Sequence, residues 1–122
     1  MFKQIAAWGL AVLLAALFVL VGCSKILGPS SAEWALRLSK WGYPADSRYA
    51  IGTIEILAGV GLLLPVLRHQ AATLLGFMMV GAFGTHLIYR EWAHLLPSLL
   101  LLGLLYVLYR LFPTLPPASE RD

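Results

Sequence analysis

The chain has 122 residues, of which 60% are hydrophobic and only 12% are charged, with a formal net charge of +3. A soluble domain carries roughly 25% charged residues and could not bury this much apolar surface in its own core, so the composition indicates a membrane protein. The basic residues form no patch for nucleic acid, and the single cysteine excludes an internal disulfide and a multi-cysteine metal site.

The first apolar stretch, residues 5–24, predicts a transmembrane helix, because about 20 residues at 1.5 Å each cross the hydrocarbon core. Its end, Leu20-Val21-Gly22-Cys23, also resembles a bacterial lipoprotein signal in which Cys23 would carry a lipid. Only Lys3 precedes the stretch, and the stretch exceeds the usual signal core of about 7–15 residues. These two features favour a first transmembrane helix, with the lipidated form as the alternative.

Residues 31–41 predict a short helix that lies in the membrane interface. Ser30-Ser31-Ala32-Glu33 fits a capping box at its start, and Gly42 followed by Tyr43-Pro44 is a stop signal. Tryptophans at headgroup depth are common in such helices. One face carries apolar side chains at helical spacing: Trp34, Leu38 and Trp41.

Three further apolar stretches predict transmembrane helices: residues 50–67, 71–89 and 95–112. The connections between them are short, which forces neighbouring helices to run antiparallel. We therefore expect an all-α polytopic membrane protein, in which residues 1–112 form an antiparallel four-transmembrane-helix bundle with the short interfacial helix between the first two spans. Residues 113–122 contain three prolines and predict a flexible tail.

Glu55 is a carboxylate in the middle of the second stretch, where a charge costs at least about 2.5–3.5 kcal/mol. Gly52 and Gly59 lie on the same helical face, so Glu55 is predicted to face protein and not lipid. Pro65 is expected to bend or end this helix. Small-residue pairs predict close helix contacts in the third stretch as well: Ala72 with Gly76, and Gly81 with Thr85.

Alternating topology places Glu55, Lys25 and His86 in the same leaflet as a candidate intramembrane polar site. In the functional interpretation, Glu55 is an acid or base in a polar pocket. In the structural interpretation, a Lys25–Glu55 ion pair or a Glu55–His86 hydrogen bond only holds helices together. No catalytic residue and no metal-ligand spacing is identified. Further contributors and an interfacial lid are expected nearby: His94, Ser98 and Thr85 as contributors, with Trp34 and Trp41 as the lid.

Three segments carry a resemblance to a known family: Gly22-Cys23-Ser24-Lys25-Ile26, then Gly52 to Gly59 running on to Leu62-Leu63-Leu64-Pro65, then Ala82-Phe83-Gly84-Thr85-His86-Leu87. They resemble the ends of the first three helices in the DoxX family, especially its DoxX-like branch, over about residues 5–112. The resemblance implies a four-helix inner-membrane protein. It also implies links to a quinone-reducing thiosulfate oxidoreductase, to thiol-redox complexes and, in animal relatives, to receptor assembly in the endoplasmic reticulum.

Three functions are compatible with these features. The first is an accessory subunit or assembly factor of a quinone- or thiol-linked membrane redox system, with no independent catalytic activity. The second is a quinone site formed by Glu55 and His86, since these groups handle protons near neutral pH. The third is a small proton-coupled transporter that resembles the small multidrug resistance proteins and uses Glu55.

The expected partners are the lipid bilayer, a membrane or soluble redox protein, and a second copy of the chain. The expected location is the inner membrane, with both termini cytoplasmic. The positive charges barely set an orientation, since 4 basic residues fall on one side and 5 on the other. The two sets are Lys3, Arg68, Arg110 and Arg121, and Lys25, Arg37, Lys40, Arg48 and Arg90.

Overall fold

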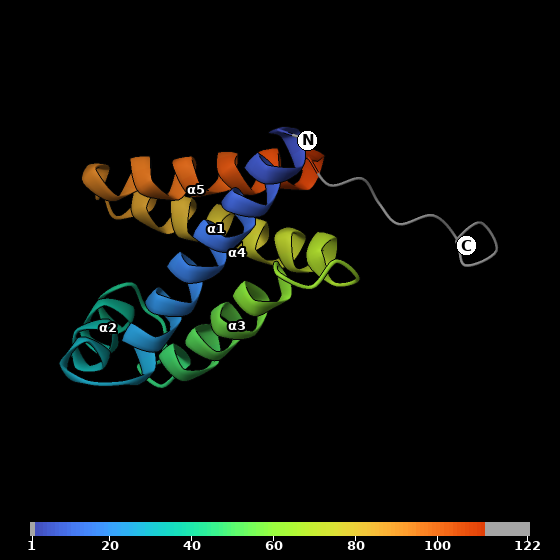
Figure 1. The fold of residues 1–122 in the computed structure, drawn as a ribbon. Coiled ribbons are helices and arrows are strands. Elements are labelled where there is room, and N and C mark those ends of the chain that lie inside the picture. Colours follow the sequence, from blue (N-terminus) through green and yellow to red (C-terminus); the bar gives the residue numbers. More distant parts are fainter. Residues whose placement is uncertain (1, 112–122) are drawn as a thin grey trace.

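A computed structural model describes residues 2–111, and within them the chain is all α-helical (Figure 1). The helices are α1 (Phe2–Ile26), α2 (Pro29–Lys40), α3 (Ser47–Gly61), α4 (Arg68–Ile88) and α5 (Trp92–Leu111). The predicted tail and the final residue of the fourth predicted span lie outside the described residues. The predicted all-α, membrane-spanning fold class is confirmed, because α1, α4 and α5 are long and apolar enough to cross a membrane.

The second predicted span, residues 50–67, differs at both ends from the helix in the structure, α3. Helix α3 begins at Ser47 and has 15 residues, so it extends about 22 Å, less than the hydrocarbon thickness of about 30 Å. Residues 62–67 form turns and lead into α4. The turn is tight, because a Cβ added at Gly61 would lie 3.1 Å from the Cβ of Ala71. Pro65 lies inside this turn, where it cannot continue a helix.

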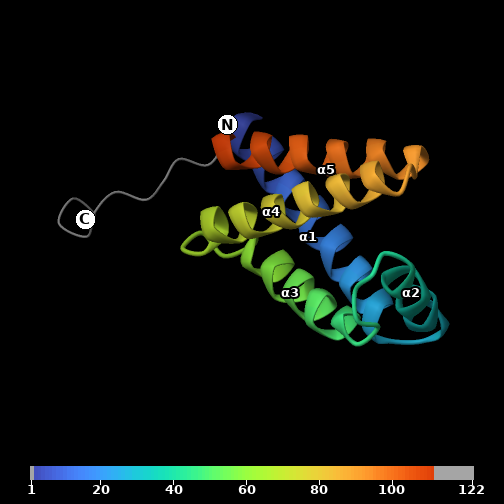
Figure 2. The ribbon, with the colours of Figure 1, turned by 180° about the vertical axis from the view of Figure 1, so that it is seen from behind.

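The long helices form two antiparallel pairs, α1 with α3 and α4 with α5, and the pairs cross obliquely (Figures 1 and 2). Helix α1 also packs on α5, and α3 packs on α4. Large apolar side chains fill the crossing and are fully buried: Leu14, Phe18, Leu62, Leu75 and Leu108. The predicted antiparallel neighbours are therefore present, but as crossed pairs and not as an even bundle.

Helix α2 lies beside the end of α1 and the start of α3 (Figure 2). The predicted capping box at its start is wrong, since Gly28 is the N-cap residue and no side chain caps the helix. The serine hydroxyls bind the end of α1 instead. Ser30 donates to the carbonyl of Ser24 at 2.8 Å, and Ser31 donates to the carbonyl of Lys25 at 2.8 Å. They thus satisfy carbonyls that the end of a helix leaves unpaired.

The predicted stop at the end of α2 is confirmed. Gly42 has a φ of 86°, a left-handed conformation that favours glycine. The amide of Tyr43 donates to the carbonyl of Leu38 at 2.8 Å, and the amide of Gly42 donates to the carbonyl of Ser39 at 3.1 Å. This pair of bonds is a Schellman motif, and it turns the chain back towards α3 and α4.

Glycines bring α1 and α3 into backbone contact. A Cβ added at Gly22 would lie 2.6 Å from the carbonyl oxygen of Gly52, and one added at Gly52 would lie 2.7 Å from that of Gly22. Gly59 makes a looser but still tight contact, since its Cβ would lie 3.3 Å from the carbonyl oxygen of Ala15. The small-residue face predicted around Glu55 is therefore a real helix contact.

The small residues of α4 behave differently. A Cβ at Gly76 would meet only Leu102 of α5, at 3.8 Å, whereas a Cβ at Gly81 would meet nothing within 4 Å. Ala72 and Gly76 therefore face α5, but without the close approach that was predicted, and the contact predicted at Gly81 is wrong. A small-xxx-small pattern marks a possible close approach, but it does not show that a neighbour takes that position.

Candidate functional site

The structure brings Lys25 and Glu55 together. The ammonium of Lys25, in the last turn of α1, donates a hydrogen bond to the carboxylate of Glu55, in the middle of α3. Only 1% of Glu55 and 8% of Lys25 is exposed. A charge in such surroundings is costly unless it is paired, so each group depends on the other.

The glycine contact explains why these two side chains meet. Lys25 lies three residues after Gly22, and Glu55 lies three residues after Gly52, so each charge shares a helical face with its glycine. Because α1 and α3 run antiparallel and touch at Gly22 and Gly52, Lys25 and Glu55 lie one turn to either side of this contact, and their side chains extend along the glycine face to meet. The local sequence thus sets the geometry of the pair.

Helix α2 covers this pair through Trp34. The ammonium of Lys25 lies 4.5 Å from the centroid of the Trp34 ring, a cation–π contact. The indole Nε1 of Trp34 donates to the hydroxyl of Ser24 at 3.2 Å, which holds the ring in place. Arg48 also reaches this region, where its Nε donates to the hydroxyl of Ser31 at 2.9 Å. One of the two expected lid residues therefore lies over the candidate site.

His86 belongs to a different cluster. Its Nδ1 lies 2.9 Å from Oε1 of Glu91, and its ring packs edge-on against Trp41 with the centroids 5.4 Å apart. Within residues 2–111, His86 makes no hydrogen bond or ion pair with Glu55 or Lys25. The expected site of Glu55, Lys25 and His86 is therefore divided between two places. The imidazole of His86 binds Glu91, which lies only five residues further along the chain.

The His86–Glu91 cluster ties the end of α2 to the connection between α4 and α5. Lys40 Nζ lies 3.8 Å from Glu91 Oε2, and the Tyr89 hydroxyl donates to the carbonyl of Trp41 at 2.9 Å. The hydrogen bond from His86 is the largest effect and holds the pKa of the Glu91 carboxyl below its ordinary value; burial acts in the opposite direction, and electrostatic interactions with His86, Lys40 and His94 lower the pKa further.

The three expected contributors also lie at this cluster or beside it, and not at Glu55. The rings of His94 and His86 have their centroids 5.2 Å apart, and the hydroxyl of Ser98 donates to the carbonyl of His94 at 3.3 Å. The hydroxyl of Thr85 lies 3.1 Å from that of Tyr43. Of the three, only Thr85 contacts the loop after α2, whereas His94 packs on the ring of His86 and Ser98 bonds within α5.

Sequence reasoning missed the burial of Arg68. This residue sits in the short connection between two apolar stretches, a position that suggests a headgroup contact. In the structure it is only 3% exposed, its Nε donates to the carbonyl of Leu62 at 2.7 Å, and its guanidinium lies 4.5 Å from the Trp8 ring centroid. Arg68 therefore fixes the turn between α3 and α4 from inside.

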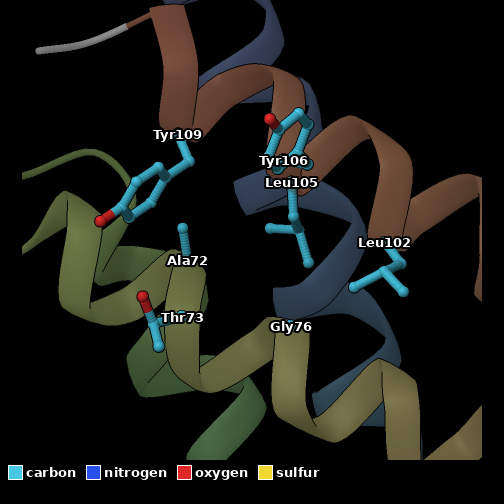
Figure 3. Close-up of a pocket in the computed structure, with 7 residues that line it drawn as sticks. All are labelled: Ala72, Thr73, Gly76, Leu102, Leu105, Tyr106 and Tyr109. Atoms are coloured by element: carbon cyan, nitrogen blue, oxygen red, sulfur yellow. The ribbon is translucent and has the colours of Figure 1, made fainter.

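An apolar hollow lies elsewhere, between α4 and α5, with a cavity volume of about 260 Å³ (Figure 3). Neither Lys25 nor Glu55 lines it. Within residues 2–111, no group of three His, Cys, Asp or Glu side chains is arranged to hold a metal ion. Cys23 is a free, partly exposed thiol in α1, and its lipidation stays a prediction.

Comparison with known proteins gives one family. The family model described as "DoxX-like family" matches residues 9–108, which include α2, α3 and α4 in full and most of α1 and α5. The chain matches no curated protein and no solved structure.

Proposed function

The chain belongs to the DoxX-like family, and from that premise we propose that it is an accessory subunit or assembly factor of a quinone- or thiol-linked membrane redox system. We propose further that it resides in the inner membrane with both termini cytoplasmic. Its role is to bind and stabilise partner proteins, and it has no independent catalytic activity. The observation that carries this proposal is the closed Lys25–Glu55 pair.

A carboxylate that transfers protons to a substrate must come within hydrogen-bond reach of that substrate or of a bridging water. Glu55 is 1% exposed, binds Lys25 and lies beneath the contact between Lys25 and Trp34. This arrangement supports a pair that fastens α1, α2 and α3 together. It argues against Glu55 as the working group of a transporter or of a quinone site.

The outer surface of α4 supports a partner within the membrane. A Cβ at Gly81 or at Gly84 would meet nothing within 4 Å, and the nearby side chains of Val80 and Ile88 are exposed. Small residues let a second helix approach closely and gain packing contacts in lipid. We propose this face as the contact for a transmembrane helix of the redox partner, with a second copy of the chain as the alternative occupant.

The test separates a fastening role from a chemical one. We expect Lys25→Met and Glu55→Gln to reduce the amount of folded protein, whereas the paired change Lys25→Met with Glu55→Leu restores it, because both buried charges are removed together. Affinity purification from native membranes, followed by mass spectrometry, should recover the same partners with the paired variant as with the natural chain. Lys3→Met and Glu33→Gln are matched controls at exposed positions.

Three outcomes would contradict the proposal. The first is a folded paired variant that has lost its partners, and the second is repeated failure of the natural chain to recover any partner. The third is activity of the isolated protein: counterflow of a cationic drug in proteoliposomes, or quinone binding that disappears in the folded paired variant. Either activity would make Glu55 a working residue instead of a fastening one.

A further inference from the structure

The hollow between α4 and α5 is an apolar groove bounded by side chains of very different size (Figure 3). Ala72 and Gly76 of α4 form one wall, and Leu102, Leu105 and Tyr106 of α5 form the other. The groove exists because α4 has almost no side chain here, as a Cβ at Gly76 would still lie 3.8 Å from Leu102. Its volume of about 260 Å³ suits a slender apolar ligand.

A second hollow, of about 490 Å³, continues from the first towards the start of α4. The two share Thr73 and Tyr109, and the second adds polar side chains, His69 and Gln70. Gly76 lies about 10 Å further along α4 than His69, because each residue of a helix rises 1.5 Å. The joined hollows therefore change from polar at the helix end to apolar inside the span, which is the polarity of a lipid.

The charges at this end of the molecule have one sign. The start of α1, the start of α4 and the end of α5 carry three charged side chains among the described residues, and all three are basic: Lys3, Arg68 and Arg110. The acidic residues within 2–111 lie on or before α2, α3 and α5, away from this end: Glu33, Asp46, Glu55 and Glu91. Of the three basic residues, Arg68 is buried in the turn between α3 and α4, whereas Lys3 and Arg110 are exposed, and exposed basic residues at a membrane surface attract anionic headgroups.

We propose that this groove binds one anionic glycerophospholipid. An acyl chain lies between Gly76 and Leu105, the glycerol region lies near Thr73 and Tyr109, and the phosphate lies at the basic helix ends beside His69 and Arg110. Burial of methylene groups between two spans contributes contacts that the charges alone do not supply, and the charges select the headgroup. The proposal does not depend on the redox role proposed above.

The first experiment uses the natural chain. It is placed in nanodiscs with equal amounts of phosphatidylglycerol and phosphatidylethanolamine, with a trace of phosphatidylglycerol that carries a photoreactive group on its acyl chain. We expect cross-links to concentrate between residues 72–77 and 102–109. Cross-links spread evenly over the outer faces of α1, α4 and α5 would overturn the proposal, since they would describe ordinary surrounding lipid.

The second experiment fills the groove. Gly76→Leu should abolish the phosphatidylglycerol that native mass spectrometry finds on the natural chain in mild detergent, whereas Gly76→Ala should retain it. Gly81→Leu is the matched control, because it adds the same side chain to the same helix at a position with no neighbour within 4 Å. Equal retention by Gly76→Leu and Gly81→Leu, or an adduct that proves to be a quinone or a second copy of the chain, would overturn the proposal.

The third experiment tests the headgroup. We expect Arg110→Gln to lower the ratio of bound phosphatidylglycerol to bound phosphatidylethanolamine about fivefold, the factor that one basic residue near an anionic surface supplies. An unchanged ratio would overturn the choice of an anionic lipid. Because the measured quantity is a ratio on protein that is already folded, a general loss of stability does not mimic the result.

Discussion

The two helix pairs have similar compositions but opposite packing. Between α1 and α3 the backbones touch at Gly22 and Gly52, whereas between α4 and α5 a hollow remains beside Gly76. Burial follows the same division. In the most apolar part of α1, 33% of the residues are buried, against 22% in α4 and 17% in α5. A glycine therefore tightens a membrane protein only where another helix takes the place of its missing side chain.

The largest effect is expected in the tightly packed half of the molecule, α1 with α3, when one charge of its buried pair is removed; the loose half is α4 with α5. Lys25→Met leaves the Glu55 carboxylate without its ammonium, and we expect a loss of about 3 kcal/mol in the free energy of unfolding, because an unpaired charge is left in an apolar site. Unfolding of purified protein by dodecyl sulfate titration measures the change. Lys3→Met should shift the transition little, and an equal shift for both variants would show that the pair contributes nothing.

A methyl group at the glycine contact should have the next largest effect. Gly52→Ala places a Cβ 2.7 Å from the carbonyl oxygen of Gly22, so α1 and α3 must separate, and we expect a loss of about 1–3 kcal/mol. Gly81→Ala in the loose half should instead be neutral or stabilising by at most about 1 kcal/mol, because it removes backbone freedom without a clash. Similar unfolding transitions for the two variants would refute the contrast between the halves.

The smallest effect concerns Glu91, which joins α2 to the loose half. A carboxyl whose pKa is lower in the folded protein than in the unfolded chain stabilises the fold above the unfolded pKa, and this contribution is lost as the pH falls through the folded pKa. For Glu91 the ordinary value is 4.5 and the folded value is lower, so the loss occurs on acidification below about pH 4.5. We expect less than about 1 kcal/mol, since the group is near the surface.

Comparison of thermal unfolding at pH 6 and pH 4 for the natural chain and for Glu91→Gln measures this contribution. The variant should be less stable at the higher pH, and the difference should shrink at the lower one. A difference that stays constant with pH would show that the hydrogen bond with His86 does not depend on the charge of Glu91.

Much of the fold followed from the sequence because long apolar stretches and short connections leave few arrangements. The Lys25–Glu55 pair could be predicted for the same reason. The alternating direction of successive helices sets the depth of each residue in the membrane, and the glycines mark the sides of the helices that face each other. Helical spacing on α2 likewise grouped Trp34 with Leu38 and Trp41 on one apolar face, and Trp34 on that face contacts Lys25. These predictions depend on depth and periodicity, which a sequence contains directly.

The remaining features depend on which helices pack together, and periodicity does not contain that information. His86 shares a leaflet with Glu55, but equal depth does not specify direction around the bundle, and Glu91 lies closer along the chain. The end of α3 at Gly61 was hidden because the leucines that follow are as apolar in a turn as in a helix. The serines before α2 matched a capping pattern, although the nearby end of α1 offered their hydroxyls other acceptors.

The bonds from Ser30 and Ser31 to the end of α1 have a consequence for biogenesis. They link residues only six positions apart, so the corner between α1 and α2 can form as soon as that part of the chain has been synthesised. The partner of Lys25 is synthesised 30 residues later, on α3, which is shorter than the candidate membrane spans. We therefore expect α1 to insert into the membrane first, with Lys25 at the membrane surface. The insertion of α3 should then depend on Lys25, because it pairs with Glu55.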